Sequence, residues 1–193
     1  MIAGHFGLAA GAKAGRPDLP LWTLMLATVW LDVVFAPLLA TGVEWIETAP
    51  DGHGNYGSAL IHADYTHSLV GALVLSAIYG LLFLRRFGRT SALVLGAVAF
   101  SHWVLDLVVH RADLPLLPGD LGGLPHLGMG LWRVPWLAAA VETVLIVGGA
   151  ALYYRAARQA TARAGRRERR PMVLAALVVA SGLGTLALNW ISA

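Results

Sequence analysis

The sequence predicts an all-α fold, a polytopic bundle of membrane helices, from its composition and its hydropathy. Hydrophobic residues make up 58% of the 193 residues and charged residues only 13%, about half the share usual in soluble domains. The mean hydropathy is +0.67. So much apolar surface needs a bilayer to cover it, which excludes a soluble enzyme, a disordered tail and a coiled coil. Because no internal repeat or low-complexity linker interrupts the chain, we expect one integral-membrane domain over residues 1–193.

Five apolar segments are long enough to cross a hydrocarbon core of about 30 Å, which takes about 20 helical residues. They are Leu21–Val43, Asp64–Leu84, Thr90–His110, Val134–Tyr154 and Met172–Ile191. A sixth segment, Ile2–Ala12, is too short to cross alone. It is predicted as a short re-entrant helix packed inside the protein, with a free flexible terminus as the alternative. Its Gly4, Gly7 and Gly11 favour close backbone contact with a neighbouring helix.

The basic residues predict how the chain is oriented. Lys and Arg are enriched in cytoplasmic loops, and twelve of the 14 lie in three connections, at 13–16, 85–89 and 155–170. These connections are therefore expected in the cytoplasm and the C-terminus outside, in a bacterial-type inner (plasma) membrane. The cluster Arg163–Arg170 is also typical of nucleic-acid binding. Beside a membrane span, however, such a cluster more often orients the chain and contacts anionic lipid, so membrane lipid and not nucleic acid is the expected partner.

Four polar residues lie inside the predicted spans: Asp32 in the first, His102 and Asp106 in the third, and Glu142 in the fourth. An acidic side chain at the bilayer centre costs about 2.5–3.5 kcal/mol. No Lys or Arg lies within any predicted span, so the acids need protons, histidine partners or a metal cation. Because the chain has no cysteine, a metal must be held by His, Asp or Glu.

The spacing of the polar residues predicts one shared site in the outer half of the bundle. His102, Asp106 and His110 are four residues apart and therefore form a stripe on one helix face. The second span begins on the same side of the membrane and starts with His62, Asp64 and His67. Simpler roles stay open for some of these residues. Asp64 is a suitable helix N-cap, and His62 and His110 are suited to the membrane interface.

Several short motifs resemble those of the predicted membrane-bound metal-dependent hydrolase family. They are Gly4-His5, the mid-span Asp32, HADYTHS at 62–68 and SHWVLD at 101–106. The resemblance covers residues 4–135 and implies a hydrolase with metal ligands at His5, Asp32, His62, His67, His102 and Asp106. Two departures stand out. The HRG of the family's first motif is His62-Ala63-Asp64 here, and its Pro-Asp-x-Asp is reduced to Leu31-Asp32-Val33.

The leading functional hypothesis is an integral-membrane metal-dependent hydrolase that acts on a lipid or amphiphilic ester or phosphoester. All-N/O ligands suit zinc, with manganese or iron as the alternatives. Glu142 or Asp64 is the expected general base or orienting group, and Arg111 and Arg133 are the expected phosphate-binding residues. A metal-ion or proton-coupled transporter is one alternative, because intramembrane acids also mark ion pathways. A haem-binding protein with axial histidines is the other.

Overall fold

Helices account for most of the molecule. The computed structural model describes residues 2–49, 57–165 and 169–191. Its elements are α1 (Ile2–Gly15), α2 (Leu21–Thr28), α3 (Trp30–Ala40), β1 (Trp45–Thr48), β2 (Ala59–His62), α4 (Leu69–Leu82), α5 (Leu84–Val109), α6 (Pro135–Arg163) and α7 (Arg170–Ile191). Two short 3-10 turns, η1 (Pro118–Asp120) and η2 (Leu131–Arg133), lie in the connection between α5 and α6. The prediction of a helical bundle is confirmed, and a small sheet is added to it.

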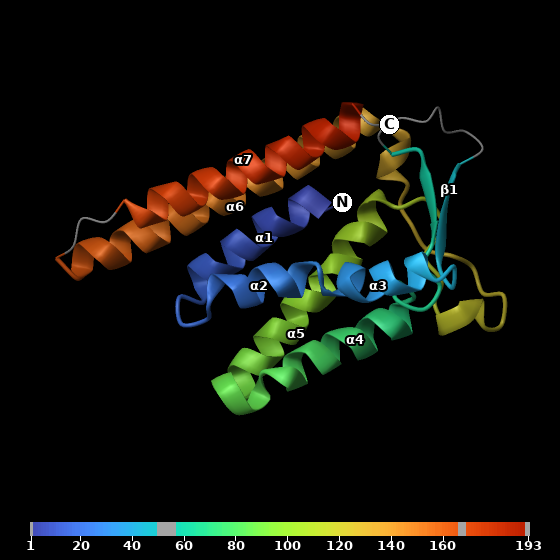
Figure 1. Cartoon of the computed structure of the whole chain (residues 1–193), viewed down its shortest axis with the longest axis horizontal. Coiled ribbons are helices and arrows are strands. Elements are labelled where there is room, and N and C mark those ends of the chain that lie inside the picture. Colours follow the sequence, from blue (N-terminus) through green and yellow to red (C-terminus); the bar gives the residue numbers. More distant parts are fainter. Residues whose placement is uncertain (1, 50–56, 166–168, 192–193) are drawn as a thin grey trace.

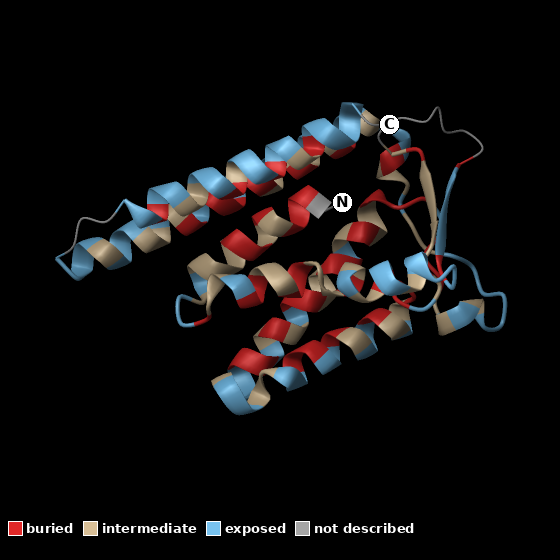
Figure 2. Cartoon of the chain, in the orientation of Figure 1, coloured by how far each residue is buried: buried red, intermediate tan, exposed pale blue. Residues whose placement is uncertain are grey.

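Three of the described helices, α5, α6 and α7, are long and apolar enough to cross a membrane. They correspond to the predicted spans Thr90–His110, Val134–Tyr154 and Met172–Ile191. Figure 2 shows exposed residues along the outer sides of α6 and α7. Many are large and apolar, such as Leu177 and Leu188. Side chains of this kind on an outer face are typical of contact with lipid.

The prediction of five spanning helices is confirmed only in part. The segment Leu21–Val43 forms two helices, α2 and α3, which meet at an angle of 49°. Only the two helices together are long and apolar enough to form one span. Thr28 contributes to this break, because its hydroxyl donates to the carbonyl of Met25 within the last turn of α2. The break lies beside Asp32, so the irregular backbone occurs where the first span carries its acidic residue.

The predicted span Asp64–Leu84 is shorter than expected. Its helix, α4, begins only at Leu69, and 14 residues rise about 21 Å, less than the hydrocarbon thickness. Ser68 is the N-cap, with its hydroxyl accepting from the amide of Gly71. The cap expected of Asp64 is therefore made by Ser68. The residues before it, including His67, lie in a turn, and the side chains of Thr66 and His67 form part of the site described below.

The short N-terminal segment is a helix packed inside the protein, as the sequence predicts. The helix α1 packs against α6, α2, α7 and α5, and Figure 2 shows it as buried along much of its length. Gly7 explains the close approach to α6, since a Cβ on Gly7 would overlap the carbonyl oxygen of Leu145. On α6, a Cβ on Gly149 would overlap the carbonyl oxygen of Gly7 in turn. Small residues at both positions bring the two backbones together.

A two-stranded antiparallel sheet occupies part of the connection predicted between the first two spans. The register pairs Trp45 of β1 with His62 of β2. This pairing brings the residue before β1, Glu44, beside the turn that follows β2, where it accepts hydrogen bonds from Tyr65 and Thr66. The hairpin therefore holds a buried carboxylate next to His67.

The connections rich in Lys and Arg lie at one end of the molecule. Figure 1 shows the α1–α2 and α4–α5 connections at the left, together with the end of α6 and the start of α7, and the sheet and the end of α7 at the right. This arrangement is the one that a positive-inside orientation requires. The three apolar helices support a membrane protein, while the side that faces the cytoplasm stays a prediction.

Candidate metal centre

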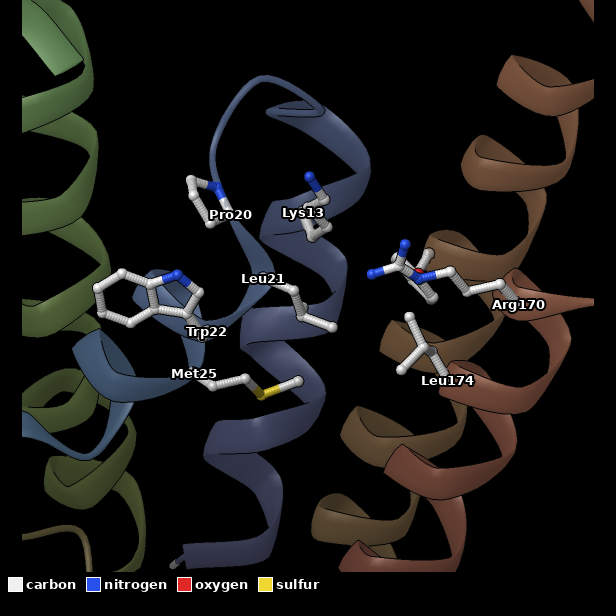
Figure 3. A pocket seen from close by; sticks show the side chains of 8 residues that line it. Lys13, Pro20, Leu21, Trp22, Met25, Arg170 and Leu174 are labelled. Carbon is white, nitrogen blue, oxygen red and sulfur yellow. The ribbon is translucent and has the colours of Figure 1, made fainter. Parts of the chain in front are cut away.

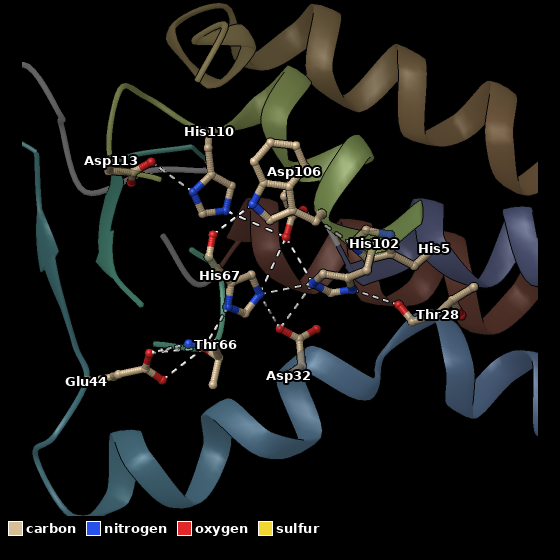
Figure 4. Close-up of polar contacts among 11 residues, drawn as sticks. His5, Thr28, Asp32, Glu44, Thr66, His67, His102, Asp106, His110 and Asp113 are labelled. Atoms are coloured by element: carbon tan, nitrogen blue, oxygen red, sulfur yellow. Dashed lines mark hydrogen bonds and ion pairs between the residues drawn. The ribbon is translucent and has the colours of Figure 1, made fainter. Parts of the chain in front are cut away.

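Five of the predicted site residues meet in the interior of the bundle (Figure 4). They form two overlapping groups that can hold a metal ion, Asp32–His67–His102 and His5–His102–Asp106. The groups come from α1, α3, the turn before α4, and α5. All five side chains are buried apart from Asp32, which is 32% exposed. The convergence of polar residues that the sequence predicts is therefore present in the fold.

A chain of hydrogen bonds fixes which nitrogen of His67 faces the site. The hydroxyl of Thr66 is 3.0 and 3.1 Å from the two carboxylate oxygens of Glu44. A hydroxyl has one proton, so Thr66 donates to Glu44 and accepts from Nδ1 of His67, at 2.8 Å. His67 then has its proton on Nδ1 and a lone pair on Nε2. Partners of this kind typically orient a metal-binding histidine.

The break between α2 and α3 fixes His102 in the same way. The carbonyl of Thr28, in the last turn of α2, is among those that a helix leaves without an intrahelical partner. Nδ1 of His102 lies 2.7 Å from this oxygen. Because a carbonyl can only accept, Nδ1 of His102 carries a proton, and in the neutral imidazole Nε2 presents a lone pair to the site.

The two Nε2 atoms of His67 and His102 are 3.1 Å apart. When both rings are neutral, each of these nitrogens carries a lone pair, so the two cannot hydrogen-bond to each other. Oδ1 of Asp32 lies 3.6 Å from both. Ligand atoms at about 2.1 Å from one cation, at angles of 90–110°, are about 3.0–3.4 Å apart. The 3.1 Å separation lies within this range and the two 3.6 Å separations exceed it slightly, so Asp32, His67 and His102 form a face, an isosceles triangle of ligand atoms close to the size that a single cation imposes.

Asp106 links this face to His5. Its Oδ2 is 2.9 Å from Nε2 of His102 and 3.7 Å from Nε2 of His67, and its Oδ1 is 3.3 Å from Nε2 of His5. The ring of His5 stacks on His102 with a centroid distance of 4.0 Å. Within the described residues, Nδ1 of His5 has no hydrogen-bond partner and Nε2 has only its 3.3 Å contact with Asp106, although the side chain is completely buried. A buried imidazole in that condition indicates that a ligand belongs at the site.

His110 faces the same group from the end of α5. Its Nδ1 is 2.9 Å from Oδ1 of Asp113, and Oδ2 of Asp113 accepts from the amide of Ile61 on β2. Nε2 of His110 is 3.9 Å from Oδ2 of Asp106. The stripe of His102, Asp106 and His110 that the spacing predicts is thus present, and Asp113 orients its outer member.

Glu142 anchors the helix that carries His5. Its Oε2 accepts a hydrogen bond of 3.0 Å from the amide of Gly4. The first amides of a helix lack intrahelical partners and attract negative charge, so a buried carboxylate on α6 is satisfied there. Glu142 belongs to neither ligand group. Its contact is with the start of α1, one residue before His5, which makes it a positioning residue in this structure.

Besides Glu142, four predicted site residues lie outside the cluster. His62, on β2, stacks on Trp45 and lies 3.0 Å from Oε1 of Glu47. Asp64 is half-buried in the turn after β2, where its carbonyl accepts from Gly119. Arg111 is buried and donates to the carbonyl of Gly57, and Arg133 is exposed on η2. The structure thus separates these four from the two ligand groups.

Four residues that orient the histidines were not predicted: Thr28, Glu44, Thr66 and Asp113. Glu44 lies outside every predicted span, so no sequence pattern indicated that its side chain is buried. Asp113 could have been found, because it follows His110 by three residues and so lies near it at the end of a helix. The role of Thr28 depends on a main-chain oxygen and on the break in the first span, neither of which has a sequence signal.

Comparison with known proteins gave no match to a family model, a curated protein or a solved structure. Function is therefore inferred from the chemistry of the site. Two imidazole nitrogens with fixed lone pairs and two carboxylates meet in the protein interior. None of these four groups can donate a hydrogen bond to the others when the carboxylates are ionised and both imidazoles are neutral. Such a buried His/Asp group can bind a metal ion.

Proposed function

We propose that this protein is an integral-membrane metal-dependent hydrolase acting on a lipid or amphiphilic ester or phosphoester. One divalent cation is bound by Asp32, His67 and His102, with Asp106 as a fourth ligand. Zinc suits this mixture of nitrogen and oxygen ligands, as do manganese and iron. The resemblance of the HADYTHS and SHWVLD motifs to membrane-bound metal-dependent hydrolases supports the same reaction class.

The observation that carries the proposal is the 3.1 Å approach of two acceptor nitrogens, Nε2 of His67 and Nε2 of His102. Two lone pairs at this distance repel each other unless a positive charge lies beside them. Both histidines are buried, so water cannot screen the repulsion. Both also have their Nδ1 protons fixed by neighbours, so rotation of either ring would break a hydrogen bond.

The burial of the ligands supports a site that accepts a substrate from the side. His67, His102 and Asp106 are buried, whereas the Asp32 side chain is 32% exposed. Its neighbour Val33 is exposed on the outer surface of α3. A substrate that reaches the cation past Asp32 would therefore pass an apolar surface. That path suits an amphiphile with its reactive group at the end of an apolar chain.

When bound, a divalent cation polarises an ester or phosphoryl oxygen and lowers the pKa of a coordinated water towards neutrality. The neighbouring residues of this chain hold the histidines around the site in position. Asp113 holds His110 with Nε2 towards Asp106, where His110 can hydrogen-bond to a water or a substrate oxygen. Glu142 holds α1, and with it His5, against the opposite side of the group. The buried surroundings exclude bulk water and so strengthen each of these interactions.

Transport of a metal ion or proton is the alternative that shares these ligands. The exposure of Asp32 on one side favours a site with one opening, whereas a carrier needs access from both sides of the membrane. Haem is a poorer fit. Axial histidines lie on opposite faces of a porphyrin, but here the two Nε2 atoms face each other at 3.1 Å, with Asp32 and Asp106 beside them.

The test begins with elemental analysis of the full chain purified in detergent. We expect about one equivalent of a divalent metal in the wild type and in His62→Ala, a matched histidine outside the cluster. We expect none in His102→Ala, because His102 belongs to both ligand groups. Hydrolysis is then measured on a panel of ester and phosphoester lipids, before and after chelation and with metal restored.

Metal-dependent hydrolysis that His102→Ala abolishes and His62→Ala retains would support the proposal. Two results would refute it. Protein without bound metal, and without metal-dependent stabilisation, would remove the metal site itself. Bound metal without hydrolysis of any lipid ester, combined with metal or proton flux in liposomes that Asp106→Ala abolishes, would identify a carrier instead.

A further inference from the structure

A cavity lies at the basic end of the molecule, away from the metal-binding groups. Its volume is about 730 Å³, and it lies between the α1–α2 hairpin and the pair α6–α7 (Figure 3). Most of the residues that line it are apolar, and two are cations. The lining residues are Lys13, Pro20, Leu21, Trp22, Met25, Tyr153, Arg170 and Leu174. A groove of this size can hold part of a lipid molecule.

The charges at the mouth of this cavity are positive. Figure 3 shows the Arg170 side chain extending from α7 towards α1, where the Lys13 ammonium points to the α1–α2 connection. Nζ of Lys13 donates to the carbonyls of Pro17 and Leu19, at 2.9 and 2.6 Å. An ammonium group has three donors, so one is left for a ligand. Across residues 2–49, 57–165 and 169–191, no carboxylate lies within ion-pair distance of Arg170.

Asp18, the acidic residue nearest to Lys13 in the sequence, is already paired with another cation. Asp18, in the α1–α2 connection, accepts hydrogen bonds of 2.9 and 2.6 Å from the guanidinium of Arg16. These bonds lower the pKa of Asp18 to about 2, so it stays ionised and bound to Arg16 at neutral pH. Asp18 is thus hydrogen-bonded to Arg16, and among the described residues neither Lys13 nor Arg170 forms an ion pair with a carboxylate, so both cations can contact an anionic ligand.

The position of the cavity matches the headgroup level of one leaflet. It lies at the end of the bundle that carries the basic connections. Trp22 is exposed beside it and Tyr153 lines it, and these two residue types are enriched at the membrane interface. Below the cations, Leu21, Met25 and Leu174 offer an apolar wall. The two cations of the cavity are therefore complementary to a phosphate, and its apolar wall is complementary to an acyl chain below that phosphate.

We propose that this cavity binds an anionic phospholipid of the cytoplasmic leaflet, with its phosphate between Lys13 and Arg170 and an acyl chain against Leu21, Met25 and Leu174. The site is separate from the metal centre and requires no metal. A bound lipid would fill the gap between α2 and the start of α7. Basic pockets between membrane helices on the cytoplasmic side commonly bind such headgroups.

The test measures lipid binding to the full-length, chelator-treated protein in detergent. Native mass spectrometry detects the bound lipid. Phosphatidylglycerol, phosphatidylcholine and inorganic phosphate are titrated separately. We expect saturable binding of phosphatidylglycerol, weaker binding of phosphatidylcholine, and no competition by inorganic phosphate at the same concentration. Arg170→Gln should weaken phosphatidylglycerol binding about fivefold. Arg85→Gln, which removes an exposed cation at the same end but outside the cavity, should leave binding unchanged.

A second variant tests the apolar half without touching a charge. Leu174→Trp should fill the groove and weaken binding of phosphatidylglycerol while the thermal unfolding midpoint stays within a few degrees of the wild type. Lys13→Gln is a poorer choice, because Lys13 also holds the α1–α2 turn. Equal binding of the two lipids, equal losses in Arg170→Gln and Arg85→Gln, or competition by free phosphate would each overturn the proposal. None of these results bears on hydrolysis or on metal content.

Discussion

Nε2 of His67 and Nε2 of His102 face each other at 3.1 Å, while the Nδ1 atom of each ring is held by a separate partner. The partners come from different parts of the chain. One is Thr66, backed by Glu44 from the start of the hairpin, and the other is the carbonyl of Thr28 at the break in the first span. Two independent devices thus turn two histidines to the same point, which is the feature that separates this site from an incidental pair of core histidines.

Removal of the metal is expected to destabilise the protein. A ligand that binds only the folded state at 100 times its dissociation constant adds about 2.7 kcal/mol to the free energy of unfolding. A chelator should therefore lower the thermal unfolding midpoint of the wild type in detergent by several degrees, and zinc or manganese should restore it. In His102→Ala the midpoint should no longer respond to chelator. An equal response in both proteins would contradict a metal at this site.

The two ligand groups are expected to differ in importance. His67 belongs to the group with Asp32, and His5 belongs to the group with Asp106. With one cation at the Asp32–His67–His102 face, His67→Ala should lose the metal. His5→Ala should retain most of it, because only its stacking on His102 and its contact with Asp106 are removed. Elemental analysis of both variants, beside His126→Ala as a surface control, measures the difference. The reverse order would move the cation to the His5 side.

Thr66 is expected to act through His67. In Thr66→Val the hydroxyl that accepts from Nδ1 is lost, so the ring is no longer fixed with Nε2 towards the cation. Loss of such a partner typically costs 10- to 100-fold in metal affinity. Competition with a chelator of known affinity measures the change. Thr66→Ser should restore binding, and Thr41→Val, which removes an exposed hydroxyl on α3's C-cap, should not affect it. Failure of the serine to rescue would indicate a packing role only.

Much of this site could be predicted, because its members obey local spacing rules. His102, Asp106 and His110 share a helix face, and the acids needed partners in any apolar span. His62 is a predicted ligand only through the resemblance of HADYTHS to the motif of the hydrolase family, and the residues between it and His67 form a turn and not a helix. Pairing with β1 then turns His62 towards Glu47 and Trp45. Four-residue strands in a polar connection give no periodic signal long enough to predict.

The shape of the spans was harder to predict for a related reason. Hydropathy reports how apolar a segment is, not where its backbone bonds are interrupted. Leu21–Val43 contains Thr28 within an otherwise apolar stretch, and the bend of 49° follows at that point. The late start of α4 depends on the capping hydroxyl of Ser68, which follows His67 directly. Both departures lie beside metal-binding residues, where irregular backbone is tolerated because it is enclosed by protein.

Close packing of α1 on α6 is expected to be essential for stability. Gly7→Ala should destabilise the protein by about 1–3 kcal/mol, because its Cβ would overlap the carbonyl oxygen of Leu145. Gly148→Ala is the matched control on α6: a Cβ there meets no described atom within 4 Å, and alanine is the better helix former. Unfolding in detergent, followed by circular dichroism, measures both. Equal midpoints for the two variants would show that the helices do not pack at Gly7.

The orientation can be tested without altering any functional residue, because the chain contains no cysteine. A single cysteine is then the only target for a maleimide. Leu121→Cys places it in the exposed α5–α6 connection, and Ala160→Cys places it at the exposed basic end of α6. If basic connections face the cytoplasm, a membrane-impermeant maleimide should label Leu121→Cys in intact cells and Ala160→Cys only after permeabilisation. The cysteine-free wild type controls for background. The opposite pattern would place the metal centre in the cytoplasmic half of the bilayer and the lipid cavity in the outer leaflet.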